Sequence, residues 1–174
     1  EVDMNEAEEL ILTSISADRR TIGVTTLNGG GLQFRHYGEL ETHGGQMFDM
    51  RAEVGLLSRR VLVRGDETTA NTLVGAHIMM HSGGDESVVG RFSNVECYLC
   101  GQAFALGRYP IHFHMIGRVV KSYITNCSVH HSNNRGFTIH GVHGLRLYNN
   151  VVFNNLGHSI FIEDGIETNN VIEH

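Results

Sequence analysis

Proline and tryptophan are almost missing from this chain of 174 residues, which contains one proline and no tryptophan. Cysteine is also scarce, and the three thiols at 97, 100 and 127 are too few for a disulfide framework. No apolar run is long enough for a membrane span or a signal peptide. The formal net charge of −6 argues against nucleic acid, or an anionic membrane, as the main partner.

Glycine and histidine are plentiful instead, with 21 and 12 residues. A short phrase occurs three times, as Tyr-Pro-Ile-His-Phe-His, Arg-Gly-Phe-Thr-Ile-His and His-Ser-Ile-Phe-Ile-Glu. Each phrase has two apolar residues separated by one position and then a polar residue. These last residues are His114, His140 and Glu163, so the repeat measures 26 and then 23 residues, the length of one coil in a solenoid. The phrases are therefore expected to be strands stacked on one another.

A second repeated pattern supports the same fold. The segments 91–97, 123–129 and 146–152 each place an asparagine between two apolar residues, as expected for the corner of a coil. No stretch has a convincing helical period. The sequence therefore predicts an all-β protein whose residues 47–174 form a right-handed parallel β-helix. Residues 1–46 are expected to add short strands and a hairpin over 9–27 that lead into the solenoid.

Two further expectations follow from the repeat and from the ends of the chain. The repeat places Cys97 at an inward position, which favours a buried structural thiol over a redox or metal site with Cys100. The chain starts without methionine and stops inside a coil, so we expect it to be a piece of a larger protein. Any membrane association would then depend on parts outside this chain.

The polar residues that end the phrases are the main clue to function. Equivalent residues on neighbouring parallel strands lie about 4.8 Å apart, so His114, His140 and Glu163 are expected to converge on one outer face. Two imidazoles and a carboxylate suit a divalent metal, zinc or another transition metal, with calcium as a further option. Alternation puts His112 on the same face as a fourth ligand or a proton shuttle. It also adds His77 as a metal ligand, if its strand lies one coil earlier.

Other residues near the phrases are candidates for contact with a substrate. Arg135 and Arg108 would neutralise an acidic polymer, and Tyr109 would stack on a sugar ring. His158 is expected at the rim, and Asp164 sits beside Glu163 where the strand ends. The competing interpretation is a packed polar stack in which the histidines and Glu163 only satisfy one another.

Four short motifs, in order and with compatible spacing, resemble a known family. They are Glu-Val-Gly-Leu-Leu-Ser-Arg at 53–59, the first phrase with its preceding Gly-Arg at 107–114, the His-rich segment at 128–141, and 156–165. They are similar to the β-helix region of the G8-domain-containing proteins, the family of the cell-migration-inducing hyaluronan-binding protein and transmembrane protein 2. This resemblance implies an extracellular or cell-surface protein that acts in hyaluronan binding and depolymerisation.

The leading hypothesis is a carbohydrate-active β-helix that binds and depolymerises an acidic polysaccharide. A hydrolase would use Glu163 and Asp164 as acid and base. A lyase would use a metal or Arg135 to neutralise a uronate, while a base such as His112 or Tyr109 removes the α-proton. The alternatives are a non-catalytic polysaccharide-binding or adhesion scaffold and a metal-binding structural solenoid.

Overall fold

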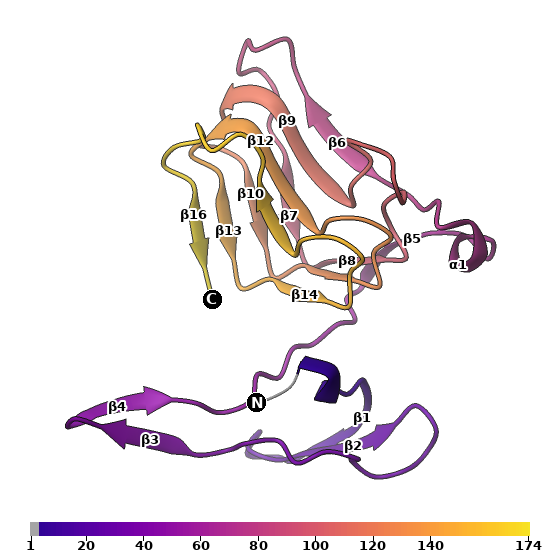
Figure 1. Cartoon of the computed structure of the whole chain (residues 1–174), viewed down its shortest axis with the longest axis vertical. Coiled ribbons are helices and arrows are strands. Elements are labelled where there is room, and N and C mark those ends of the chain that lie inside the picture. The colour runs from indigo at the N-terminus through magenta and orange to yellow at the C-terminus, as the bar shows by residue number, and fades with distance from the viewer. Residues whose placement is uncertain (1–3) are drawn as a thin grey trace. The chain divides into compact units, whose positions relative to one another are not determined.

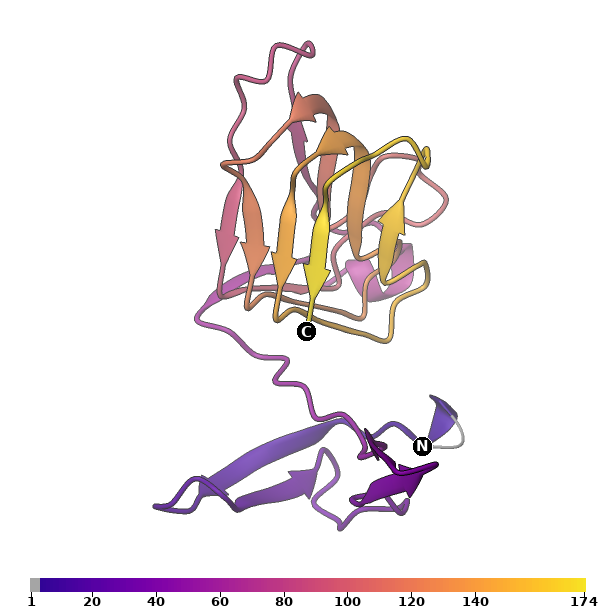
Figure 2. The same cartoon turned by 90° about the vertical axis from the view of Figure 1, so that its left-hand side faces the viewer.

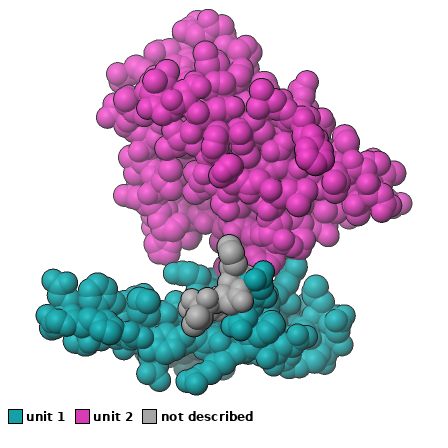
Figure 3. All heavy atoms as spheres, viewed as in Figure 1, with its two compact units in different colours: residues 1–54 teal, residues 55–174 magenta. Residues whose placement is uncertain are grey.

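The computed structural model describes residues 4–174, which form two compact units divided after Val54 (Figure 3). The first unit contains the 3₁₀ helix η1 (Met4–Glu6) and two antiparallel hairpins. One hairpin pairs β1 (Leu10–Ile15) with β2 (Ile22–Thr26), which confirms the hairpin expected there. The other pairs β3 (Leu40–His43) with β4 (Gln46–Asp49). The expected start of the solenoid at residue 47 falls inside β4, so the division lies later in the chain.

The second unit is the predicted parallel β-helix. Twelve strands form three sheets, and the chain visits the sheets in turn (Figures 1 and 2). Sheet I contains β5 (Val61–Arg64), β8 (Val95–Tyr98), β11 (Ser128–His130) and β14 (Val151–Phe153). Sheet II contains β6 (Ile78–His81), β9 (Ile111–Arg118), β12 (Phe137–His143) and β15 (Ile160–Ile162). Sheet III contains β7 (Arg91–Ser93), β10 (Tyr123–Thr125), β13 (Arg146–Tyr148) and β16 (Val171–Glu173).

The repeated phrases set the register of sheet II. Ile78, Ile111, Phe137 and Ile160 are paired from strand to strand, and the next apolar position follows the same order. Because side chains alternate across a strand, these residues point inward and stack into one continuous core. The inward expectation for Cys97 is confirmed, since the residue is fully buried and its thiol is free.

Asparagines mark one corner of the coils, as the second pattern predicts. Asn94, Asn126 and Asn149 have φ angles of 56°, 53° and 52°, a left-handed conformation that asparagine tolerates better than most residues. The Asn149 side-chain amide donates a hydrogen bond of 2.7 Å to the Asn126 side-chain oxygen. The corner ladder therefore both turns the chain and ties neighbouring coils together.

The first coil differs from the later ones. It contains the short helix α1 (Thr69–Thr72) between β5 and β6, and β6 begins only at Ile78, after His77. None of the helices in the described part of the chain is long and apolar enough to cross a membrane. The later start of β6 changes which histidine reaches the candidate site.

Candidate functional site

The register of sheet II brings the expected polar column together. His81 pairs with His114 and His114 pairs with His140, while the backbone N–H of Glu163 donates to the Ile139 carbonyl at 3.0 Å. The first histidine of the column is therefore His81. The expectation that His77 joins the column as a metal ligand is wrong, because the histidine paired with His114 lies four residues later in the chain. His77 instead lies before β6, where its Nε2 accepts a hydrogen bond of 2.9 Å from Arg108.

Three imidazoles converge on the outer side of β9 and β12. One ring nitrogen from each of His112, His114 and His140 lies within 4.8 Å of the other two. The ring centroids of His114 and His140 are 4.7 Å apart, and their Nδ1 atoms are 3.0 Å apart. Two nitrogens at that distance must share a proton or face a common cation. The cluster therefore has the donor set of a transition-metal centre.

The environment of His112 fixes its ring and its charge. Its Nδ1 donates a hydrogen bond of 3.0 Å to the Gly107 carbonyl, because a carbonyl oxygen only accepts. Its Nε2 is therefore left with a lone pair. His112 is only 1% exposed, and this burial lowers its pKa to about 4. Burial, followed by the nearby charge of His140, also lowers the pKa of His114. Both rings are expected to be neutral at pH 7, as metal ligands must be.

Several buried polar atoms on this face have no hydrogen-bond partner among the described residues. They are His112 Nε2, Thr138 Oγ1 and Glu163 Oε2. Thr138 pairs with His112 across the two central strands, so its hydroxyl lies on the same face as the imidazoles. The Glu163 oxygen is 3.6 Å from His140 Nδ1, which is an ion-pair contact but too long for a hydrogen bond. Buried polar groups are normally satisfied, so these atoms indicate a site for a ligand.

Two carboxylates contact the same imidazole. Besides Glu163 at Nδ1, Asp164 lies 3.1 Å from His140 Nε2. Both reach the ring because β15 ends at Ile162 and the chain then turns. Glu167 holds this turn by accepting hydrogen bonds from the backbone N–H groups of Gly141 and Asp164, at 2.9 and 3.3 Å. The two acids therefore orient one histidine rather than face each other across a substrate.

The Arg135 side chain binds other residues of the protein. Its guanidinium donates a hydrogen bond of 2.7 Å to the Tyr109 hydroxyl and lies 3.3 Å from Glu163 Oε1. It also stacks on the Phe161 ring, 3.8 Å from the centroid. Tyr109 is 1% exposed and packs against His112, so the expectation that its ring stacks on a sugar is not met. Instead, Tyr109 packs against His112 and Arg135 pairs with Glu163, so both side chains contact residues of the candidate site.

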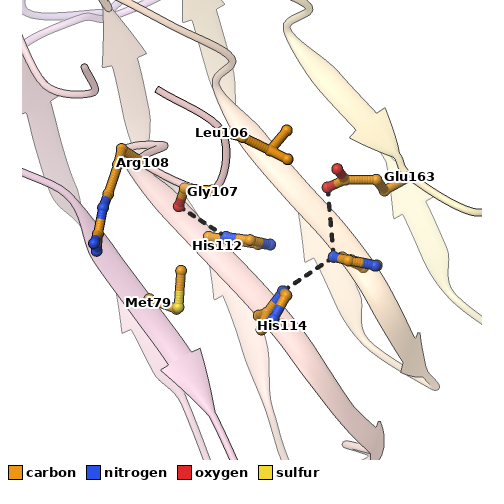
Figure 4. Close-up of a pocket in the computed structure, with 8 residues that line it drawn as sticks. Met79, Leu106, Gly107, Arg108, His112, His114 and Glu163 are labelled. Atoms are coloured by element: carbon orange, nitrogen blue, oxygen red, sulfur yellow. Dashed lines mark hydrogen bonds and ion pairs between the residues drawn. The ribbon is translucent and has the colours of Figure 1, made fainter. Parts of the chain in front are cut away.

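A cavity of about 320 Å³ opens over the cluster (Figure 4). Its lining residues come from β6, β9, β12, the segment before β9 and the segment after β15; they are Met79, Leu106, Gly107, Arg108, His112, His114, His140 and Glu163. Arg108 therefore lies where the sequence expects a substrate contact. His158 does not line the cavity, and its exposed ring packs against Phe161.

One residue that the sequence interpretation missed had a detectable signal. The segment Ile78-Met79-Met80-His81 repeats the apolar, spacer, apolar, polar order of the three later phrases. Its 33-residue distance to His114 hides the match. The unpartnered hydroxyl of the buried Thr138 had no such signal, because threonine is common at outward-pointing positions of strands.

A stack of parallel strands with a histidine-lined cavity on one outer face defines this chain as a β-solenoid with a candidate metal centre. A family model described as CEMIP beta-helix matches residues 73–174, more than half of the chain. The chain therefore belongs to the CEMIP β-helix family, which confirms the resemblance seen in its motifs.

Curated relatives extend this result. A G8 domain-containing protein of Dictyostelium discoideum is 37% identical over 171 residues, covering 95% of this chain and 11% of that protein. Fibrocystin-L of Homo sapiens is 33% identical over 205 residues, covering 97% of this chain and 5% of its own length. Cell surface hyaluronidase of Danio rerio is 34% identical over 189 residues, covering 98% of this chain and 13% of that protein. This chain thus spans only a small part of these relatives.

Proposed function

We propose that this chain binds an acidic polysaccharide, hyaluronan or a similar polymer, at the cavity of sheet II and cleaves it with the help of a bound metal ion. The name of the Danio rerio relative, cell surface hyaluronidase, supports both the substrate class and a location at the cell surface. The observation that carries the proposal is the group of unpartnered buried atoms, His112 Nε2, Thr138 Oγ1 and Glu163 Oε2, beside two further imidazoles.

The donor set fits a transition metal. His112, His114 and His140 would hold the ion, with Glu163 as a neighbouring carboxylate. Imidazole nitrogens suit zinc, copper, iron or nickel, whereas calcium prefers six or more oxygens, which this cluster does not offer. The hydrogen bond from His112 Nδ1 to Gly107 is the kind of outer contact that orients a metal-ligating histidine. Such an ion, when bound, would polarise a substrate oxygen and activate water.

The cavity wall supplies the contact for the polymer. Arg108 lines the cavity, and its guanidinium donates to a ring nitrogen of His77 rather than to a carboxylate, so its charge is available for a uronate carboxylate. Arg135 differs, because Glu163 already lies 3.3 Å from its guanidinium. Leu106 and Met79 complete the wall with apolar surface for the C–H face of a sugar. Of the two arginines expected to neutralise an acidic polymer, Arg108 is therefore the one that we assign to the uronate.

Hydrolysis is the better fit of the two reactions. The lyase hypothesis offers a metal or Arg135 to neutralise the uronate and a base such as His112 or Tyr109, and of these Arg135 and Tyr109 are occupied inside the protein. Glu163 Oε2, by contrast, has no hydrogen-bond partner and lies beside His140, so it is placed to accept a proton from an attacking water. Asp164 would hold the opposite side of the same imidazole.

Metal analysis combined with a cleavage assay tests the proposal. Purified protein is expected to contain about one transition-metal ion per chain, and His114→Ala and His140→Ala should lose both metal and cleavage, each by at least about 100-fold. His43→Ala, which removes an exposed histidine of β3, is the control and should retain both. Protein without stoichiometric metal, together with intact cleavage in both variants, would sink the metal proposal.

The products identify the reaction. A new reducing end without an unsaturated uronate marks hydrolysis, whereas a 4,5-unsaturated uronate marks a lyase and contradicts the role given to Glu163. If wild-type protein binds hyaluronan but cleaves no polymer under metal-loaded conditions, the chain is a binding scaffold instead.

A further inference from the structure

The outer face of sheet III carries a regular grid of aromatic and cationic side chains. The strand register aligns Arg91, Tyr123 and Arg146 in one column. The second column aligns Ser93, Thr125 and Tyr148. The residues between the columns point inward, and two of them, Ile124 and Leu147, are 1% exposed. The four strands lie side by side in Figure 2, where this sheet faces the viewer.

The centre of this grid is hollowed. Tyr123, Thr125, Arg146 and Tyr148 line a shallow depression of about 310 Å³, which is the lower end of the size range of small-ligand sites. Tyr148 is 42% exposed, and the Arg146 guanidinium lies 5.8 Å from the centre of its ring. The depression therefore combines two phenol rings, a hydroxyl and a cation at one open surface.

The charge of this face is opposite to that of the whole chain. Arg91, Lys121 and Arg146 are exposed here, although the chain has a formal net charge of −6. Arg91 Nε donates a hydrogen bond of 3.1 Å to the Lys121 carbonyl, which brings these two cations together at one edge. The acid in the grid is Glu173, 3.5 Å from Arg146, and both of these side chains are more than half exposed. Such an exposed ion pair is weak and is easily replaced by a ligand carboxylate.

We infer that this face is a second polysaccharide-binding site, separate from the cavity of sheet II, that takes uronate-bearing chains. The exposed ring of Tyr148 and the half-buried ring of Tyr123 offer flat apolar surfaces for the C–H faces of sugars, and the flanking arginines offer forked donors for carboxylates. The Arg91, Tyr123 and Arg146 column spans two strand spacings, roughly 10 Å. A sugar chain lying across the strands therefore meets a cation, a ring and a cation in succession.

This inference rests on the proposed function only for the class of polymer. The site would hold part of a long chain while another part occupies the cavity of sheet II, since the two sheets are successive in every coil. Two linked contacts on one polymer raise the overall affinity without any new contact at the cavity. Long chains should therefore gain more from sheet III than short ones.

Binding measurements on the full chain test the inference without any need for catalysis. Isothermal titration with short hyaluronan oligosaccharides should show that Tyr148→Ala weakens binding by roughly 5-fold and Arg146→Gln by roughly 3-fold. The matched control is Arg64→Gln, which removes the same charge from an exposed residue of sheet I and should leave affinity unchanged. The effect of Arg146→Gln should shrink in high salt, because exposed charge pairs are screened.

A second arm separates this site from the cavity. In His140→Ala, which targets the cavity, titration should still show binding, and adding Tyr148→Ala should weaken that remaining binding by the same roughly 5-fold. If His140→Ala abolishes all binding and Tyr148→Ala changes nothing, the inference is wrong while the proposed function stands. Equal affinity for a neutral oligosaccharide also overturns it. If Tyr148→Ala changes the oligomeric state in light scattering but not the sugar affinity, sheet III is a protein contact and the inference fails.

Discussion

Two groups of histidines lie on different sheets of the same solenoid and differ in how their nitrogens are used. On sheet II, His112 keeps Nε2 without a partner among the described residues, and a cavity opens above it. On sheet I, both ring nitrogens of His130 have partners. Its Nε2 lies 3.1 Å from Glu96 Oε1, and its Nδ1 lies 3.0 Å from His131 Nδ1.

The surroundings of the sheet I group explain this difference. The Tyr98 ring stacks on His130 at 5.0 Å, and the backbone N–H of Arg59 donates to the other oxygen of Glu96 at 2.8 Å. His130 and Glu96 are 5% and 9% exposed. A buried polar network of this kind contributes to stability because its members satisfy one another. The two groups share the close pair of Nδ1 atoms, and they differ because His112 on sheet II has a buried ring nitrogen without a hydrogen-bond partner among the described residues, whereas both nitrogens of His130 have partners.

The largest expected difference between the groups concerns acid stability. The pKa of His112 is about 4 in the folded protein, against an ordinary value of 6.5, so the unfolded chain takes up a proton first as the pH falls. The stability associated with neutral His112 is complete above pH 6.5 and decreases down to about pH 4, by about 3 kcal/mol. Urea unfolding between pH 7 and 4, with a chelator present, measures it.

His112→Asn is the matched variant, since its side-chain amide can still donate to Gly107. It should lose this part of the pH dependence. An identical pH slope in wild type and variant would contradict the assignment of a neutral, desolvated His112.

A smaller difference concerns stability at neutral pH. His130→Ala leaves Oε1 of a buried carboxylate without its partner and should lower the free energy of unfolding by about 2 kcal/mol. His140→Ala should change it by less than about 1 kcal/mol, because its side chain is partly exposed, Asp164 reaches water and the contact with Glu163 is too long for a hydrogen bond. Equal losses in the two variants, measured by chemical denaturation, would remove the distinction between the structural and the functional group.

The smallest expected effect concerns the first histidine of the sheet II column. His81 Nδ1 lies 3.1 Å from the His114 carbonyl oxygen, but His81 does not belong to the converging group. His81→Ala should therefore weaken metal binding by only roughly 3-fold, as for the loss of one exposed hydrogen bond. Competition titration with a chromogenic chelator measures this effect. A loss as large as that of His114→Ala would make His81 a ligand and extend the centre by one strand.

The fold was predictable because its signal repeats. Apolar residues at Ile111, Phe113, Phe137 and Ile139 alternate with period two, and only one register buries them all. The column of His114, His140 and Glu163 follows from that register. The identity of its first member did not, because the segment 99–110 between β8 and β9 is longer than the segment 131–136 between β11 and β12, which stretches the spacing from His81 to His114 to 33 residues.

The roles of Arg135 and Tyr109 were not predictable from the same pattern. Strand periodicity tells on which face a side chain lies, but it does not tell what covers that face. Tyr109 precedes β9 and is covered by a guanidinium from the following coil. An arginine that stacks on two rings and pairs with Glu163 looks, in the sequence, like one that faces solvent.

The histidines and the carboxylate of the candidate site come from different coils, so one can be changed without the other. The three imidazoles belong to two successive strands, β9 and β12, whereas Glu163 arrives with the next coil. Coils in such a stack contact only their neighbours, so a whole coil can be inserted without disturbing those further away. Duplicating the coil between β12 and β15 would move Glu163 one strand outward, by about 4.8 Å, and keep the imidazoles together. The carboxylate can thus be exchanged by changing the coil after β12, whereas the three histidines stay together on β9 and β12. Different coils at that place could position different acids beside the same histidines.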